Sequence, residues 1–366
     1  ALSAVASALA SSFTALVIAR MLGGLGVGAA LIIAPMYIAE ISPASKRGRM
    51  VSFNQLNIVL GISVAFFTNY LILKLGQSQA DWAVALHFDS WNWRWMLGIE
   101  AVPAIVYFCC LHLVPESPRW LIMHDKKNQA LTIMSKISTV EQARREIELI
   151  SASLKSANAA GLAAVSPVRQ LFEKPMHLVL CIGLSVAVLQ QITGINAVFF
   201  YAPMIFEQSG ISTDAAFMQA IFVGLTNLVF TLIAMALIDK LGRKPILLFG
   251  VTGIAFFMFL LAYGFNAATY TLSAQAIESL PASIDRTQLQ QLQDIIFYSD
   301  ISFKQAIVGT LGSSGLREFE SALINTAITM NPTLILIGIL GFVASFAISL
   351  GPVMWVLFSE IFPNHI

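Results

Sequence analysis

Charged residues are scarce in this chain: Asp, Glu, Lys and Arg make up 11% of its 366 residues, whereas hydrophobic residues make up 57%. Soluble domains carry about 25% charged residues. The composition therefore excludes an ordinary soluble enzyme. The formal net charge is only +1, so no excess of basic residues indicates a nucleic-acid partner.

Cysteine is also scarce. The three cysteines, Cys109, Cys110 and Cys181, lie inside apolar runs, with no CxxC pair and no nearby pair of histidines. Disulfide frameworks and zinc sites need such spacings, so we expect these side chains to be small buried hydrophobic groups. The sequence also has no catalytic triad, metal-ligand spacing or phosphate-binding loop, and we expect neither an enzyme nor a cofactor.

The chain has long apolar stretches instead. A helix crosses the hydrocarbon core of a bilayer with about 20 mostly apolar residues. Stretches of that kind cover residues 13–41, 52–75, 95–114, 177–206, 218–238, 245–265 and 333–361. None has the charged face of a soluble amphipathic helix. The sequence predicts an all-α integral membrane protein, in which residues 1–10 belong to an eighth span.

Basic residues gather in alternate loops. Segments 42–51, 115–176 and 239–244 hold three, nine and three of the 21 Lys and Arg residues. Cytoplasmic loops carry the excess of Lys and Arg, so these three loops are predicted to be cytoplasmic in a multi-pass protein of the cell membrane. The charged 115–176 segment has short apolar periodicities and is expected to form short helices on that face.

A second polar segment, residues 266–331, falls on the opposite side of the membrane. Its runs LQQLQDIIF and LREFESALI are candidate helices. We expect a solvated insertion here, and the sequence assigns it no function.

The glycine run GGLGVG at residues 23–28 superficially resembles a dinucleotide-binding loop. That motif needs a preceding strand, whereas this run lies within an apolar stretch. Gly24 and Gly28 form a GxxxG pair, which is typical of close packing between membrane helices.

Acidic and basic side chains recur at the cytoplasmic ends of the spans. They are Glu40, Arg47, Glu116, Arg119, Asp239, Arg243 and Glu360. Exposed ion pairs contribute only about 0–1 kcal/mol each, so a network of them can form and break reversibly. We interpret the set as a conformational latch; ordinary interfacial charge is the alternative for any single pair.

Carboxamides recur at mid-membrane depth. Gln55 and Asn227 lie within apolar runs, and Gln190, Gln191 and Asn196 cluster in LQQITGINAVFFYAP. Amides in hydrocarbon are costly unless hydrogen-bonded, and each offers donors and acceptors suited to a polyhydroxyl ligand. The cluster predicts a solute site, with hydrogen bonds between helices as the alternative.

Helix breakers accompany the amides. Gly194 is expected to loosen its helix so that Asn196 can face inward. Trp355, which follows Gly351 and Pro352, is expected to pack against a sugar ring.

Two ionisable residues, Arg20 and Glu100, lie at or within spans. Intramembrane charges are functional candidates by default. A carboxyl group whose pKa changes with burial and with a nearby arginine can serve proton coupling. A purely structural Arg–Glu pair is the competing interpretation.

Five motifs resemble one family. They are RMLGGLGVG…PMYIAEISPASKRGR, PESPRWL, QQITGINAVFFYAP, DKLGRKP and GPVMWVLFSEIFP. In this order they resemble the sugar porters of the major facilitator superfamily, especially bacterial xylose/proton symporters and glucose transporters. The resemblance implies the major facilitator fold, of which this chain covers the end of helix 3 to helix 10 of twelve.

The resemblance also implies a division of the chain. Residues 1–120 would be the remainder of the N-terminal six-helix half, and residues 121–175 a cytoplasmic helical linker. Residues 176–366 would be part of the C-terminal half, with the insertion 266–331 on the extracytoplasmic side.

The residue roles implied by the resemblance agree with the chemistry above. Substrate binding is expected from Gln55, Gln190, Gln191, Asn196, Asn227, Trp355, Phe346 and Tyr201. Phe346 would stand at the pocket edge and Tyr201 at an outer gate. The acidic and basic side chains at the span ends correspond to the family's cytoplasmic latch. Arg20 and Glu100 correspond to proton-coupling residues.

The expected function is transport of a monosaccharide, a hexose such as glucose or a pentose, by proton symport and alternating access. The alternatives are an uncoupled sugar or polyol uniporter and a non-transporting sugar receptor. The expected partners are the sugar, protons and the lipid bilayer, with no nucleic acid, and a monomer is the expected oligomeric state.

Overall fold

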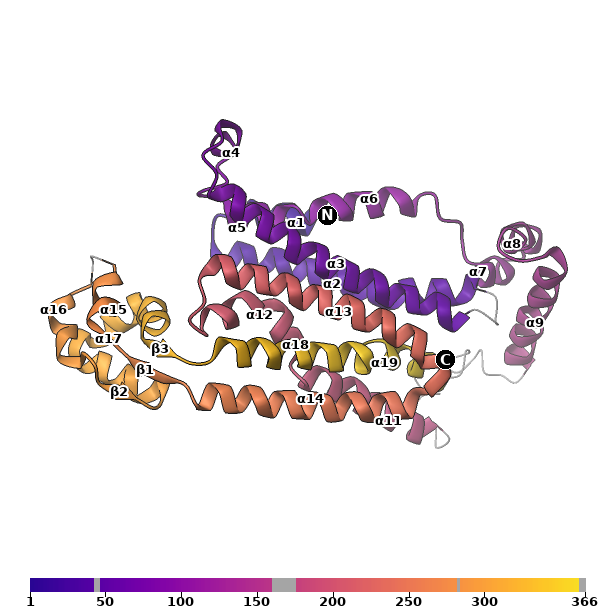
Figure 1. The fold of residues 1–366 in the computed structure, drawn as a ribbon. Helices are drawn as coiled ribbons and strands as arrows, with labels where there is room; N and C mark the ends of the chain where they lie inside the picture. The colour runs from indigo at the N-terminus through magenta and orange to yellow at the C-terminus, as the bar shows by residue number, and fades with distance from the viewer. Residues whose placement is uncertain (43–46, 160–175, 282–283, 362–366) are drawn as a thin grey trace. The chain divides into compact units, whose positions relative to one another are not determined.

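Long apolar helices dominate the computed structural model, which describes residues 1–42, 47–159, 176–281 and 284–361 (Figure 1). In that described part, seven helices are long and apolar enough to span a membrane. They cover Phe13–Ile41, Phe53–Gly76, Asn92–Leu111, His177–Glu207, Thr213–Ile238, Arg243–Asn266 and Pro332–Trp355. Each coincides with a predicted span, and the ends differ by a few residues, so the span prediction is confirmed.

The chain forms two compact units. The first comprises Ala1–Gly61, Leu71–Val188 and Pro352–Ile366. The second comprises Ile62–Tyr70 and Leu189–Gly351.

The first unit contains the N-terminal helices. They are α1 (Leu2–Ala8), α2 (Phe13–Ile41), most of α3 (Arg47–Gly76), α4 (Asp81–Ala85), α5 (Asn92–Gly98) and α6 (Ala101–Leu111). Residues 1–10, expected to belong to an eighth span, form the short helix α1, which packs against α2 and α5. Two hydrogen bonds hold it there: Ser3 Oγ donates to the Ala19 carbonyl at 2.7 Å, and Arg94 Nη1 donates to the Ala8 carbonyl at 2.8 Å.

Short helices follow the third span, as predicted for segment 115–176. They are α7 (Pro118–Met123), α8 (Lys127–Met134) and α9 (Val140–Ala159). Ser117 caps α7 by accepting a hydrogen bond from the Trp120 amide at 3.2 Å. Buried Leu121, Ile122 and Ala130 form a small core between these helices. Residues 160–175 of the segment lie outside the described residues.

The second unit contains the C-terminal spans. They are α12 (Ile195–Glu207), α13 (Thr213–Leu241), α14 (Arg243–Asn266) and α18 (Pro332–Ile348), with the end of α11 (His177–Ile192) and the start of α19 (Leu350–Ile361). α18 is the central helix, because it packs on α12, α13 and α14. Phe206, Ile335 and Phe342 are fully buried in the core of this unit.

Glycines let α14 and α18 approach closely. A Cβ atom added at Gly250 would overlap the side chain of Ser349, and one at Gly253 would overlap that of Ser345. From the other helix, a Cβ at Gly341 would overlap the ring of Phe257. Small residues at such crossings are typical of membrane helices, where packing rather than hydrophobic burial drives association.

The predicted GxxxG contact is not made among the described residues and stays a prediction. A Cβ atom at Gly24 or Gly28 would meet nothing within 4 Å, whereas one at Gly23 would meet Ser3 of α1. The expectation of buried cysteines is wrong, because all three cysteine side chains are exposed. Cys109 and Cys110 lie on α6, and Cys181 lies on α11.

The insertion between α14 and α18 is a small folded domain rather than a string of helices (Figure 1). Its elements are β1 (Thr269–Thr271), α15 (Ala274–Ser279), α16 (Arg286–Leu289), η3 (Gln290–Leu292), β2 (Ile296–Phe297), α17 (Asp300–Ala327) and β3 (Ile328–Thr329). The strands form an antiparallel sheet in the order β2-β1-β3. LREFESALI is helical within α17, as expected, whereas Ile296 and Phe297 at the end of LQQLQDIIF pair as a strand. The described chain remains mostly helical, as predicted, and this short sheet lies in the insertion.

The insertion has its own core and an ion-pair clamp. Phe303, Ile307 and Leu323 are fully buried, and α17 bends at Gly312, where φ is +75°. Lys304, before the bend, lies 2.9 Å from Asp300 and 2.7 Å from Glu320, which comes after it. Hydrogen bonds to these carboxylates raise the pKa of Lys304, so the clamp stays charged at neutral pH.

Replacing Gly250 with Leu is expected to lower the Tm of the full-length protein in detergent. The added side chain must displace Ser349 and the backbone at Ser345, and overpacking of this kind costs about 1–3 kcal/mol. Gly309→Leu is the control, since a Cβ there meets nothing within 4 Å. Equal Tm values for the two variants would contradict close packing of α14 on α18.

Candidate functional site

Three carboxamides form a chain of hydrogen bonds in the second unit. Gln190, in the last turn of α11, is 8% exposed. Gln191 Nε2 donates to Gln190 Oε1 at 3.2 Å, and Asn196 Nδ2 donates to Gln191 Oε1 at 2.7 Å. The structure therefore brings together the three amides that the sequence grouped.

A break in the span makes this arrangement possible. Successive residues of an α-helix turn by about 100°, so side chains five positions apart point about 140° away from each other. Gly194 has a φ of +82° and separates α11 from α12. The predicted loosening at Gly194 is confirmed as a complete break, and it turns Asn196 toward Gln191. Thr193 Oγ1 donates to the Gln190 carbonyl at 2.6 Å, which satisfies one of the acceptors at the broken end.

Asn227 lies in the middle of α13 and is 3% exposed. Thr231, one turn further along the same face, is fully buried, and its hydroxyl has no hydrogen-bond partner among the described residues. Sequence reasoning missed Thr231 because threonine is common in apolar helices. The spacing of four residues from Asn227 is the signal that could have found it.

The other predicted substrate residues are less closely grouped. Phe346 is 6% exposed and belongs to the core of the second unit, whereas the Tyr201 side chain on α12 is 58% exposed. Gln55 on α3 and Trp355 on α19 are half-buried and belong to the first unit. The structure therefore groups the amides of α11 and α12, and the roles of Gln55 and Trp355 stay predictions.

Arg20 and Glu100 form an ion pair in the first unit. Arg20 Nη1, on α2, lies 2.9 Å from Glu100 Oε2, at the start of α6. Both side chains are half-exposed in the described chain. The geometry fits the structural-pair interpretation, and it also places the carboxylate next to the arginine, as proton coupling requires.

The described members of the predicted latch lie at span ends. Glu40 is half-buried in the last turn of α2, and Arg119 is in the first turn of α7. Arg243, at the start of α14, donates from Nη1 to the Ile238 carbonyl at 3.4 Å. The side chains of Arg47, Asp239 and Glu360 are outside the described residues, so the latch stays a prediction.

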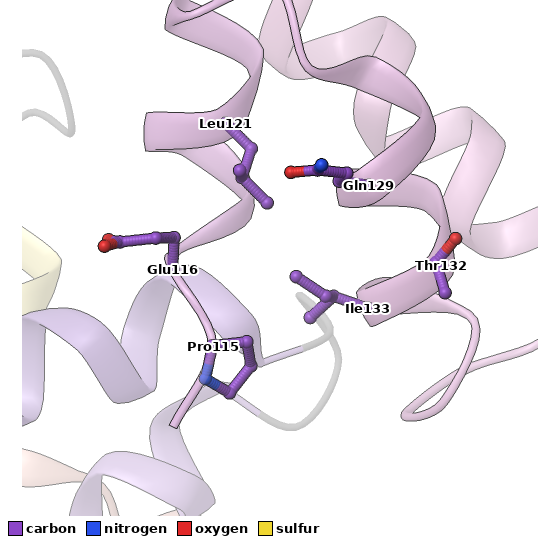
Figure 2. Close-up of a pocket in the computed structure, with 6 residues that line it drawn as sticks. All are labelled: Pro115, Glu116, Leu121, Gln129, Thr132 and Ile133. Atoms are coloured by element: carbon purple, nitrogen blue, oxygen red, sulfur yellow. The ribbon is translucent and has the colours of Figure 1, made fainter. Parts of the chain in front are cut away.

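Glu116 borders a pocket of about 320 Å³ between the end of the third span and the helices that follow. Leu121 and Ile133 give this pocket apolar walls, and Gln129 lies beside them (Figure 2). The Glu116 carboxylate points away from these side chains (Figure 2).

The described residues contain no group of three or more His, Cys, Asp or Glu side chains that could hold a metal ion. Among the described residues, seven helices are long and apolar enough to span a membrane, and one of them is broken and carries the amide chain. These features define a multi-pass membrane protein with polar groups within a span. Broken helices of this kind mark solute sites in transporters.

The chain belongs to the sugar (and other) transporter family, whose profile matches residues 1–280 and 307–366. It is 33% identical over 366 residues to the arabinose-proton symporter of Bacillus subtilis (strain 168), covering all of this chain and 63% of that protein. It is 35% identical over 350 residues to the D-xylose-proton symporter of Escherichia coli (strain K12), covering 96% of this chain and 56% of that protein. The chain thus spans less than two thirds of these relatives.

A solved structure shares the fold. It is the proton:xylose symporter of the major facilitator superfamily bound to 6-bromo-6-deoxy-D-glucose, which matches all of this chain and 65% of its own, with 32% identity and a TM-score of 0.67. The major facilitator fold expected from the sequence is therefore confirmed. Residues 281–306, inside the insertion, lie outside the family match.

Replacing Gly194 with Ala is expected to destabilise the full-length protein by about 1–2 kcal/mol, because a side chain in the left-handed region meets the following carbonyl. The measurement is the Tm in detergent. Gly194→Asn is the control, since asparagine tolerates this region better. If the Ala variant were as stable as the Asn variant, the break would not require the positive φ.

Proposed function

We propose that this chain supplies part of the translocation pathway of a monosaccharide transporter, for a hexose such as glucose or a pentose, that works by proton symport. The single observation that carries the proposal is the chain of amides at the break between α11 and α12. The printed names of two relatives, symporters of arabinose and of xylose with protons, support the same substrate class. The sugar derivative bound to the similar structure supports it too.

The amide chain suits a sugar because its two ends remain available. The two hydrogen bonds use the side-chain NH2 of Asn196, the oxygen and the NH2 of Gln191, and the side-chain oxygen of Gln190. The side-chain NH2 of Gln190 can then donate a hydrogen bond to a ligand, and the side-chain oxygen of Asn196 can accept one. A sugar hydroxyl does both. The three amides carry no charge, so they favour a neutral ligand such as a sugar over an anion.

The other predicted residues complete the proposed site. Asn227 and Thr231 would add polar contacts from α13, and Gln55 would contribute from the N-terminal half. Trp355, Phe346 and Tyr201 would give the aromatic surroundings that the resemblance implies.

Transport would proceed by alternating access. Residues 1–120 and 176–366 would rock as parts of two halves joined by the linker 121–175, and the sugar would favour closure by contacting both. The charged side chains at the span ends would form the latch on the cytoplasmic side, where loops 42–51, 115–176 and 239–244 are placed by their basic residues. Because each surface ion pair is weak, the latch can open in every cycle.

Proton coupling is assigned to Arg20 and Glu100. Their contact at 2.9 Å joins α2 to the start of α6. Protonation of the carboxyl group would remove the charge that holds the pair, and a conformational change that separates the two groups would favour proton uptake.

Replacing Asn196 or Gln190 with Ala is expected to raise the sugar Kd of the full-length protein by about tenfold. Each net hydrogen bond contributes about 0.5–1.5 kcal/mol, and each truncation also breaks the amide chain. Binding of glucose, xylose and arabinose can be measured by calorimetry. Gln305→Ala, an exposed amide on α17, is the control and should leave the Kd unchanged. Unaltered affinity in both site variants would overturn the site assignment.

Glu100→Gln is expected to abolish sugar accumulation driven by a proton gradient, while sugar exchange continues. The amide keeps a hydrogen bond to Arg20 but cannot take up the proton. Uptake and counterflow in proteoliposomes separate the two activities. The control is Glu278→Gln, at an exposed carboxylate in α15. Full accumulation by the Glu100 variant would remove Glu100 from the coupling mechanism, and uptake indifferent to the gradient in the unaltered protein would identify a uniporter.

A further inference from the structure

One span contributes to both compact units. α3 is a continuous helix from Arg47 to Gly76, and most of it belongs to the first unit. Its segment Ile62–Tyr70 belongs instead to the second unit, together with Leu189–Gly351. This segment lies near the middle of the span Phe53–Gly76. At mid-span, α3 therefore packs with the C-terminal helices.

Two residues of this segment pack on Gly224, in the middle of α13. Ser63 and Phe66 are three positions apart, so they lie on one face of α3. A Cβ atom added at Gly224 would come within 3.0 Å of Phe66 Cδ2 and of Ser63 Cα. Phe66 is buried in the core of the second unit. Because Gly224 has no side chain, α3 can pack directly on the backbone of α13.

A hydrogen bond joins the two helices at this crossing. Ser63 Oγ donates to the Gly224 carbonyl at 2.9 Å. In an α-helix each carbonyl accepts from the amide four residues later, so the Gly224 carbonyl belongs to the turn of α13 that carries Asn227. The Ser63 hydroxyl gives this turn an additional partner from another helix. Hydrogen bonds of this kind hold membrane helices in register.

Asn227 lies on the same face of α13 as Gly224. The two residues are three positions apart and are therefore neighbours on the helix surface. Both are buried, as are Val223 and Thr231. Groups that bind a ligand must be held within about 0.5 Å of the productive geometry by the residues that support them. The position of this turn therefore decides whether the Asn227 amide reaches a ligand.

We propose that Ser63 is a positioning residue of the sugar site. Through the Gly224 carbonyl it holds the turn of α13 that presents Asn227, and its own hydroxyl is directed at that carbonyl rather than at the sugar. The inference rests on the proposed function, in which Asn227 contacts the sugar. The sequence gives no signal for Ser63, because a serine in an apolar helix commonly bonds to a carbonyl of its own helix.

The matched pair Ser63→Thr and Ser63→Val tests the hydroxyl. The two variants add the same bulk at the crossing, but only threonine keeps the donor. The Kd for glucose, xylose and arabinose is measured by calorimetry on the full-length protein in detergent. It should be on the order of threefold higher for the valine variant than for the threonine variant. Ser63→Ala, which cannot overpack the crossing, should match the valine variant and keeps the test available if valine prevents folding.

A double-mutant cycle separates positioning from a general structural role. The threonine and valine variants are compared again in a protein that also carries Asn227→Ala. Because Ser63 acts through Asn227, the difference in Kd should disappear in this background, whereas a general loosening of the site would persist. Thr68→Val is the control on the same helix, since Thr68 Oγ1 donates to the Ala65 carbonyl of α3 itself at 3.0 Å. It should leave the Kd unchanged.

Equal Kd values for the threonine and valine variants would overturn the proposal, even if the valine variant had a lower Tm, because the hydroxyl would then only stabilise the fold. A difference of the same size with and without Asn227 would overturn it as well. Neither result bears on the amide chain, which is tested by replacing Gln190 and Asn196. A protein that bound none of the three sugars before any substitution would refute the proposed function itself, and the role of Ser63 with it.

Discussion

Unsatisfied polar groups cannot be left in hydrocarbon, and this constraint shapes both the spans and the candidate site. A continuous helix satisfies its own backbone, so breaks at membrane depth occur only where protein groups or a water-filled cavity take over the freed hydrogen bonds. At Gly194 part of that task falls to Thr193, whose hydroxyl donates to the Gln190 carbonyl. The break and the amide chain are therefore one feature. The break turns Asn196 toward Gln191, and the Thr193 hydroxyl satisfies one carbonyl at the broken end.

The lipid surroundings also change how the helices around the site are held together. Lipid is as apolar as leucine, so apolar area gives little reason for two spans to associate. Close contact must supply the stabilisation, and the glycines of α14 and α18 allow it. α18 in turn packs on α13, the helix that carries Asn227. Tight packing thus fixes the helix that presents buried polar groups, while the broken span beside it carries the amide chain.

The features that could be predicted from the sequence are those set by composition over a long stretch of chain. The seven spans follow from about 20 apolar residues each, and the grouping of Gln190, Gln191 and Asn196 follows from their separation along one span. Features set by tertiary partners were missed. Gly24 and Gly28 have the spacing for a close crossing but meet no described helix. The IIF run of the insertion has no decisive periodicity, and the pairing of Ile296 and Phe297 with β1 makes these two residues a strand. Thr231 could not be distinguished by sequence from other threonines in apolar helices, because its full burial and its hydroxyl without a hydrogen-bond partner among the described residues are seen only in the structure.

The position of the insertion bears on how the protein moves. Both connections to the inserted domain come from α14 and α18, the two spans that glycines bring closest together. A domain attached by short links to two tightly packed helices moves with that pair. Rocking of the halves would therefore carry the insertion along with α14 and α18, and the inserted domain can be stable through its own buried core.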